Sequence, residues 1–167
     1  HPANAIPIQY CKRFDKVPAD SLGVDPNDFA YCVLTQAPDI QPIPMIMPCE
    51  VEAFLDGAQP LDFAAVGWGL PDPMKAGGVK RWLAANQALG VSPIKDTISW
   101  GSLWNGGLLH GDSGGPTFVK LPDGSWRLLG INVTGSAAVP PWRFLDWMLA
   151  DPEVAADLDA LLPCHDP

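Results

Sequence analysis

The chain has little positive charge, no long apolar run and no closely spaced cysteines. Lys and Arg total 10 against 19 Asp and Glu, which gives its 167 residues a formal net charge of −9. Such a chain is repelled by nucleic acid and by anionic lipid surfaces, so neither is an expected partner. No apolar stretch reaches the roughly 18 residues of a membrane-spanning helix, so no membrane span is expected.

The four cysteines lie far apart, at Cys11, Cys32, Cys49 and Cys164. None forms the Cys-x-x-Cys spacing that is typical of zinc and redox sites, so we expect no metal and no cofactor. Four cysteines permit three disulfide pairings, and the sequence does not choose among them. We expect at least one disulfide; buried free thiols are the alternative, because free cysteine is commonly buried.

Length and composition predict one globular domain, residues 1–167, with 47% hydrophobic and 17% charged residues. The 19 prolines and 16 glycines recur at short intervals, which leaves room for short strands and little room for long helices. The expected fold class is therefore all-β. Because the chain begins with His1 and not with Met, we expect a processed protein that is secreted or periplasmic.

Five apolar runs bounded by turn residues predict strands. Two of them flank LPDGSW, whose Pro-Asp-Gly turn predicts a β-hairpin. Residues 1–27 are rich in proline and predict a loop or an irregular strand. The five runs are Phe29–Leu34, Ile43–Met47, Phe63–Trp68, Pro116–Leu121 and Trp126–Val133.

The end of the chain has a different pattern, which predicts two helices. Trp142, Leu145 and Leu149 recur at helical spacing. A second helix is expected to start with Asp151 as N-cap and Pro152 in the first turn. Its apolar face would consist of Val154, Leu158 and Leu161.

The stretch HGDSGGP, residues 110–116, places three glycines and a proline around one serine. Glycine permits backbone angles that other residues resist and proline fixes φ, so the stretch predicts a loop of defined shape. A serine nucleophile needs a base, a group that orients the base, and donors for the developing oxyanion. The amides of Gly111 and Ser113 are one residue apart and are candidates for those donors. Ser113 is therefore the candidate nucleophile.

GDSGGP, followed by a strand and by LLGINVTGS, resembles the nucleophile loop of trypsin-like, chymotrypsin-fold serine proteases. NDFAYCVL, residues 27–34, resembles the segment around the family's triad aspartate, and VGWG, residues 66–69, resembles its Gly-Trp-Gly strand end. The resemblance implies a double β-barrel, of which this chain holds the second barrel and part of the first. The implied parts are residues 1–50 for the first barrel, 51–140 for the second barrel and 141–167 for a helical tail.

Carried over to this chain, the resemblance makes Ser113 the catalytic nucleophile that attacks protein or peptide substrates. Gly111 and Ser113 would form the oxyanion hole, and Asp28 would orient the base. Asp112 would have a structural role, in which its carboxylate pairs with a chain-terminal amine that is freed on activation. The substrate pocket would include Gly107, Leu108, His110, Thr134 and Gly135.

Trypsin carries an acidic residue at the pocket position that corresponds to Gly107, so the resemblance implies an uncharged P1 residue of small or medium size. Two further positions depart from the family. Leu109 stands where the family has a cysteine, and Val133-Thr134-Gly135 stands where it has Ser-Trp-Gly. These departures indicate a distant, bacterial-type branch.

The family's catalytic histidine has no counterpart before Asp28. The histidines of the chain are His1, His110 and His165, and none lies in an Ala-Ala-His-Cys-like segment. His110 is expected to border the substrate pocket, because it shares the loop of Ser113. We therefore expect the larger chain of a cleaved or two-chain serine endopeptidase, inactive without the N-terminal segment of the same precursor that carries the histidine.

Two alternatives stay open. A catalytically inactive protease-like module would use the same surface to bind or regulate a partner protein. GDSGG also fits the Gly-x-Ser-x-Gly elbow of α/β-hydrolases, but that elbow leads into a helix, whereas residues 116–119 predict a strand.

Overall fold

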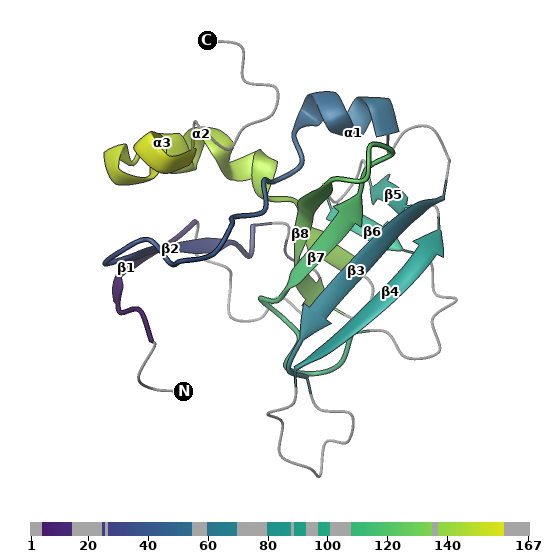
Figure 1. The fold of residues 1–167 in the computed structure, drawn as a ribbon, viewed down its shortest axis with the longest axis horizontal. Helices are drawn as coiled ribbons and strands as arrows, with labels where there is room; N and C mark the ends of the chain where they lie inside the picture. The colour runs from purple at the N-terminus through teal and green to yellow at the C-terminus, as the bar shows by residue number, and fades with distance from the viewer. Residues whose placement is uncertain are drawn as a thin grey trace.

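A computed structural model describes residues 5–14, 25, 27–54, 60–69, 80–87, 89–92, 97–100, 108–134 and 137–158. These residues form mostly β-structure with a few short helices, so the all-β expectation is confirmed at this level (Figure 1). None of the helices in the described part of the chain is long and apolar enough to cross a membrane. The strands are β1 Ile8–Arg13, β2 Ala30–Leu34, β3 Leu61–Gly67, β4 Arg81–Gln87, β5 Leu89–Ser92, β6 Thr97–Trp100, β7 Pro116–Lys120, β8 Trp126–Thr134 and β9 Ala137–Val139. The helices are α1 Pro48–Phe54, the 3-10 helix η2 Pro141–Phe144, α2 Leu145–Leu149 and α3 Pro152–Leu158.

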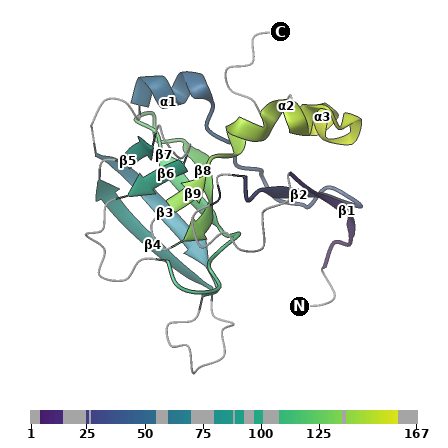
Figure 2. The same ribbon diagram turned by 180° about the vertical axis from the view of Figure 1, so that it is seen from behind.

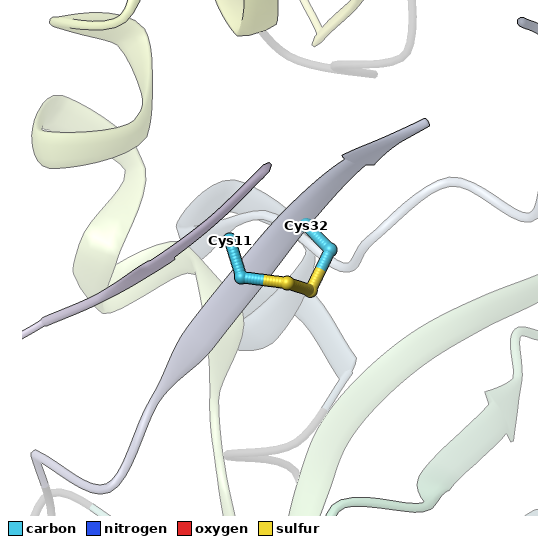
Figure 3. The surroundings of a disulfide bond; sticks show 2 residues. All are labelled: Cys11 and Cys32. Carbon is cyan, nitrogen blue, oxygen red and sulfur yellow. A yellow bond between two sulfur atoms is a disulfide. The ribbon is translucent and has the colours of Figure 1, made fainter. Parts of the chain in front are cut away.

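A small sheet is formed by β1 and β2, which pair antiparallel with Cys11 opposite Cys32. These two cysteines form a disulfide, which joins the strands across the sheet (Figure 3). Cys49 is also disulfide-bonded, so the expectation of at least one bridge is confirmed. The irregular strand expected as one alternative within residues 1–27 is present as β1, whose pairing with β2 shifts register between Ile8 and Tyr10.

The main sheet has seven strands in the order β4-β3-β7-β8-β9-β6-β5, and all its pairings are antiparallel. The expected hairpin is confirmed, since β7 and β8 are neighbours joined by a turn in which Gly124 has a φ of 87°. The run predicted at Phe63–Trp68 corresponds to β3. The strands β4, β5, β6 and β9 were not expected, because β4, β5 and β9 lack clear alternation of apolar and polar residues and β6 alternates over only four residues.

The main sheet is strongly curved. Its two edge strands, β4 and β5, are consecutive in the chain and only residue 88 separates them. Their facing ends lie at most about 7 Å apart, whereas six strand spacings in a flat sheet would span about 29 Å. The sheet must therefore curl until its edges approach each other, although no hydrogen-bonded ladder between β4 and β5 closes it in the described residues. The core inside the curl is apolar and includes Phe63, Ile98, Val119 and Leu129.

One predicted strand is wrong. Residues 43–47 make only a single bridge, between Met45 and Leu128, before α1 begins at Pro48. Pro44 has no N–H to donate to a ladder, and Pro48 starts a helix because its missing N–H and fixed φ suit the first helical position. Glu50 then accepts a hydrogen bond from the Met47 amide at 3.1 Å, as in a capping box.

The C-terminal helices pack against the small sheet, to one side of the main sheet (Figure 1, Figure 2). Both predicted helices are present in the described residues, the first as η2 followed by α2 and the second as α3. Aromatic rings form the contact, since Phe29 stacks on Phe144 at 4.3 Å and Phe14 meets the same ring edge-on at 4.7 Å. Leu161, which was expected on the apolar face of α3, lies outside the described residues.

A polar cluster centred on Asp151 reinforces this contact. One oxygen of its buried carboxylate accepts hydrogen bonds from the hydroxyls of Tyr10 and Tyr31 and pairs with the Lys12 ammonium, each at 2.7 Å. The other oxygen accepts from the Glu153 amide, which makes Asp151 the N-cap that the sequence predicts. Lys12 and the two hydroxyls hold the pKa of Asp151 well below its usual range. The small sheet is thus fixed to the start of α3 by charge as well as by packing.

Candidate active site

The candidate nucleophile, Ser113, lies on an exposed turn that leads directly into β7. We call residues 109–115 the nucleophile turn. Because Ser113 is followed by a strand and not by a helix, the α/β-hydrolase elbow is excluded. The turn starts with a hydrogen bond from the Asp112 amide to the carbonyl of Leu109 at 3.0 Å and ends with one from the Gly115 amide to the carbonyl of Asp112 at 3.0 Å. Ser113 is therefore a central residue of the second of two consecutive tight turns.

The Asp112 side chain points inward and anchors the turn to the end of β3. One carboxylate oxygen accepts the Gly69 amide at 2.6 Å, and the other accepts the Leu109 amide at 2.7 Å. Hydrogen bonds to a carboxylate are roughly twice as strong as neutral ones. Arg81 donates a hydrogen bond to the carbonyl of Gly69 at 2.8 Å. Gly69 is therefore held both by Arg81 and by Asp112. The Gly-Trp-Gly segment is thus the support of the nucleophile turn.

Glycine is required at Gly69 and at Gly111 in this arrangement. A Cβ atom on Gly69 would lie 2.6 Å from the carboxylate of Asp112, closer than real Cβ atoms approach. Gly111 has a φ of 96°, in the left-handed half of backbone space that residues with a side chain rarely adopt. The Gly-Trp-Gly motif therefore needs Gly69 because the Asp112 carboxylate approaches it closely, and the Gly-Asp-Ser motif needs Gly111 because its φ is positive.

Strand β8 holds the other side of the turn. The backbone of Asn132 accepts the Gly114 amide and donates to the Gly115 carbonyl, both at 2.8 Å. The hydroxyl of Ser113 lies 3.5 Å from the carbonyl of Val133, at the long limit of a hydrogen bond. The hydroxyl is therefore exposed and is not held by a strong acceptor.

The two candidate oxyanion donors are unpaired. Within the residues that the structure describes, neither the Gly111 amide nor the Ser113 amide donates a hydrogen bond. Both residues are exposed, so both N–H groups are accessible to a substrate. This is the state that an oxyanion hole requires before substrate arrives, because donors already used inside the protein would not stabilise a new negative charge.

Asp28 lies on the surface, two residues before β2 begins, and its amide donates to the Asp25 carbonyl at 3.2 Å. No hydrogen bond joins Asp28 to Ser113 or to His110 in the described part of the chain. The two candidates border the same hydrophobic cluster, because Phe29 belongs to it and Val133 packs against it. Asp28 thus precedes Phe29, which belongs to the cluster, and the Ser113 hydroxyl faces the carbonyl of Val133, which packs against the cluster.

The proposed substrate pocket is described only in part. Leu108 is half-buried, His110 is exposed on the turn, and Thr134 is the last residue of β8, while Gly107 and Gly135 lie outside the described residues. A pocket of about 150 Å³ lies beside Leu108, where the inner side of this turn faces the paired strands β3 and β4. Asp112 and Arg81 both line it, so its chemistry is polar as well as apolar.

His110 makes no described hydrogen bond to Ser113, and it is the one histidine among the described residues. The described residues thus include a candidate nucleophile and candidate oxyanion donors but no base in contact with Ser113. Those same residues contain no group of three His, Cys, Asp or Glu side chains that could hold a metal ion.

The sequence interpretation missed Asn132, whose side chain is buried beneath the turn. Its hydrogen-bond partner, Thr117, is likewise buried. A single amide side chain inside the otherwise apolar run LLGINV was the signal that could have indicated this role.

The sequence matches no protein-family model, and a search of curated proteins also gives no match. Residue motifs and geometry therefore carry the functional argument.

Proposed function

We propose that this protein is a serine endopeptidase that hydrolyses peptide bonds through an acyl-enzyme on Ser113. The observation that carries the proposal is the nucleophile turn. It presents an exposed serine hydroxyl beside two unpaired amides, at Gly111 and Ser113, on a backbone anchored from two sides. Both amides can therefore donate to a developing oxyanion without breaking a hydrogen bond within the described residues.

The strand order supports a chymotrypsin-like architecture. Strand β4 pairs with β3, and β5, which follows β4 in the chain, pairs with β6. If β4 and β5 are counted as one bent strand, the main sheet is an almost continuous ring of six strands. This ring fits the second barrel of the proposed fold, and β1 with β2 would be part of the first. The nucleophile turn then lies between the end of β6 and the start of β7, at the rim of the ring.

The catalytic base is proposed to come from another chain, the histidine-bearing N-terminal segment of the same precursor. An apolar groove of about 580 Å³ supports such a partner. It lies between β2, residues 36–42 and the helices α2 and α3, and next to it Ile40 is 72% exposed. The charged residues that line it are Glu153 and Asp157, so a segment with apolar and basic side chains suits it.

In the proposed reaction the histidine takes the proton from the Ser113 hydroxyl as its oxygen attacks the substrate carbonyl. The Gly111 and Ser113 amides stabilise the oxyanion, and Asp28 orients the imidazole. The imidazolium then protonates the leaving amine, and water releases the acid from the acyl-enzyme by the same steps.

The departures in the pocket favour a small or medium uncharged P1 residue. A secreted or periplasmic location is supported by the disulfide between Cys11 and Cys32, because structural disulfides persist in oxidising compartments.

The test is labelling of the native protein with a fluorophosphonate probe, followed by peptide mapping and mass measurement of every chain in the preparation. Modification of Ser113, together with a co-purifying chain that contains a histidine, is expected. Ser113→Ala should abolish labelling and Ser125→Ala, a matched change at an exposed turn, should not. An unlabelled Ser113 in a preparation that contains both chains would contradict the proposal.

The second candidate is a catalytically inactive module that binds or regulates a protein partner. It is favoured by one observation, that the described site contains no base in contact with Ser113. It predicts that the partner-bound protein leaves Ser113 unlabelled, whereas the endopeptidase is labelled in that state.

A further inference from the structure

Asn132 is a deeply buried polar side chain beneath the nucleophile turn, with 1% of its surface exposed. Its side-chain oxygen accepts a hydrogen bond from the Thr117 hydroxyl at 2.5 Å. Its side-chain nitrogen faces the carbonyl of Asp112 at 3.5 Å. Burying an amide is costly unless its polar atoms find partners, so a side chain in this place needs a compensating role.

The orientation of the amide follows from its partners. A carbonyl oxygen only accepts hydrogen bonds, so the atom of Asn132 that faces Asp112 must be the NH₂ group. The Thr117 hydroxyl serves either orientation, because it both donates and accepts. The reversed amide would place two acceptors against each other, so the arrangement with nitrogen toward the turn is fixed by chemistry.

The carbonyl of Asp112 belongs to the same peptide unit as the Ser113 amide. In a trans peptide the C=O and N–H bonds point in opposite directions. The Gly115 amide binds this carbonyl at 3.0 Å within the turn, and the Asn132 side chain draws it toward β8. The Ser113 N–H therefore points away from β8, toward the exposed side of the turn.

We propose that Asn132 is a positioning residue, which fixes the direction of the Ser113 oxyanion donor by holding the opposite end of its peptide unit. Its backbone also pairs with Gly114 and Gly115, so one residue of β8 controls the turn on both sides of Ser113. The role in catalysis rests on the proposed function; the control of the peptide orientation does not.

Two variants separate positioning from stability. Thr117→Val with Asn132→Leu removes both buried polar groups together, which avoids an unpaired one and keeps the volume similar. Thr117→Val alone breaks the same buried hydrogen bond but leaves the Asn132 nitrogen beside Asp112. A purely structural role predicts equal or greater damage in the single variant, since it leaves an unpaired buried acceptor.

The deciding measurement is the N–H bond orientation of Ser113 from residual dipolar couplings in the 167-residue chain, with Gly130 on the same strand as reference. The double variant is expected to change the coupling of Ser113 and not that of Gly130, and Thr117→Val should change neither. An unchanged Ser113 coupling in a folded double variant would overturn the proposal.

A kinetic measurement on the enzyme combined with its histidine-bearing chain tests the catalytic consequence. Loss of one oxyanion donor typically lowers kcat by about 100- to 1,000-fold, and the Gly115 amide still holds the carbonyl here, so we expect roughly a 10- to 100-fold loss. KM should change less than about threefold, because the donor acts on the transition state. Equal loss of kcat in both variants would overturn the role. A changed coupling with no reaction of wild-type Ser113 would refute the proposed function and leave the positioning intact.

Discussion

Replacement of Asp112 by asparagine tests whether its carboxylate supports the nucleophile turn. The two hydrogen bonds use different oxygens, one for the Gly69 amide and one for the Leu109 amide. Asparagine places an NH₂ group against one of the two amides, so one charge-assisted bond is lost, and the bond that its single oxygen retains is no longer charge-assisted. Such a bond contributes about 1.5–3 kcal/mol, and the lost N–H partner adds to the cost, so we expect the free energy of unfolding to fall by about 2–3 kcal/mol.

The assay is urea unfolding followed by tryptophan fluorescence, with thermal unfolding in parallel. A loss of this size should lower Tm by roughly 4–12 °C in a chain of this length, with little change in the urea m value. Asp123→Asn is the matched control, since both of its hydrogen bonds, from the amide and hydroxyl of Ser125, use one oxygen that asparagine retains. Equal destabilisation by the two substitutions, or a loss below about 0.5 kcal/mol for Asp112→Asn, would refute the reasoning.

The remaining predictions concern the small sheet. The Asp151 carboxylate raises the pKa of Tyr10, and burial together with Asp151 raises that of Tyr31, so absorbance titration of these two tyrosines should start above their ordinary pKa of about 10. Asp151→Asn should bring both titrations back toward that value; an unchanged curve would contradict the cluster. Because the pKa of Asp151 is depressed on folding, its contribution to stability is present above about pH 4 and is lost as pH falls below it, which a comparison of Tm against pH for this variant measures. Replacing Cys11 and Cys32 by serine opens a loop of 21 residues and should cost about 3 kcal/mol of unfolding free energy; a Tm change under about 2 °C would contradict this.

The elements that the sequence predicted correctly carry local signals. The β7–β8 hairpin is predicted by its turn residues. The start of α3 is predicted by two adjacent residues, the N-cap Asp151 and the first-turn proline Pro152. Helix α1 carried similar signals in Pro48 and Glu50. It was missed because the apolar residues before it were interpreted as a strand, whereas their burial comes from packing beside β8.

The parts that could not be predicted depend on contacts between distant residues. Strand β6 pairs with β9, which is remote in sequence, and register is set by the whole sheet. The motif identified Asp112 and Ser113. It did not reveal that the Asp112 carboxylate accepts a hydrogen bond from Gly69, or that the Asn132 side chain faces the Asp112 carbonyl.

The most direct test of the account is the dependence of Ser113 labelling on an added base. The purified 167-residue chain is incubated with a fluorophosphonate probe, with and without imidazole, and the labelled residue is identified by mass. Because we propose a complete nucleophile turn that lacks only its histidine, we predict slow labelling of Ser113 that imidazole accelerates and that Asp112→Asn diminishes. Labelling that is absent with imidazole, or that falls equally on Ser125, would contradict the claim that Ser113 is a catalytic nucleophile.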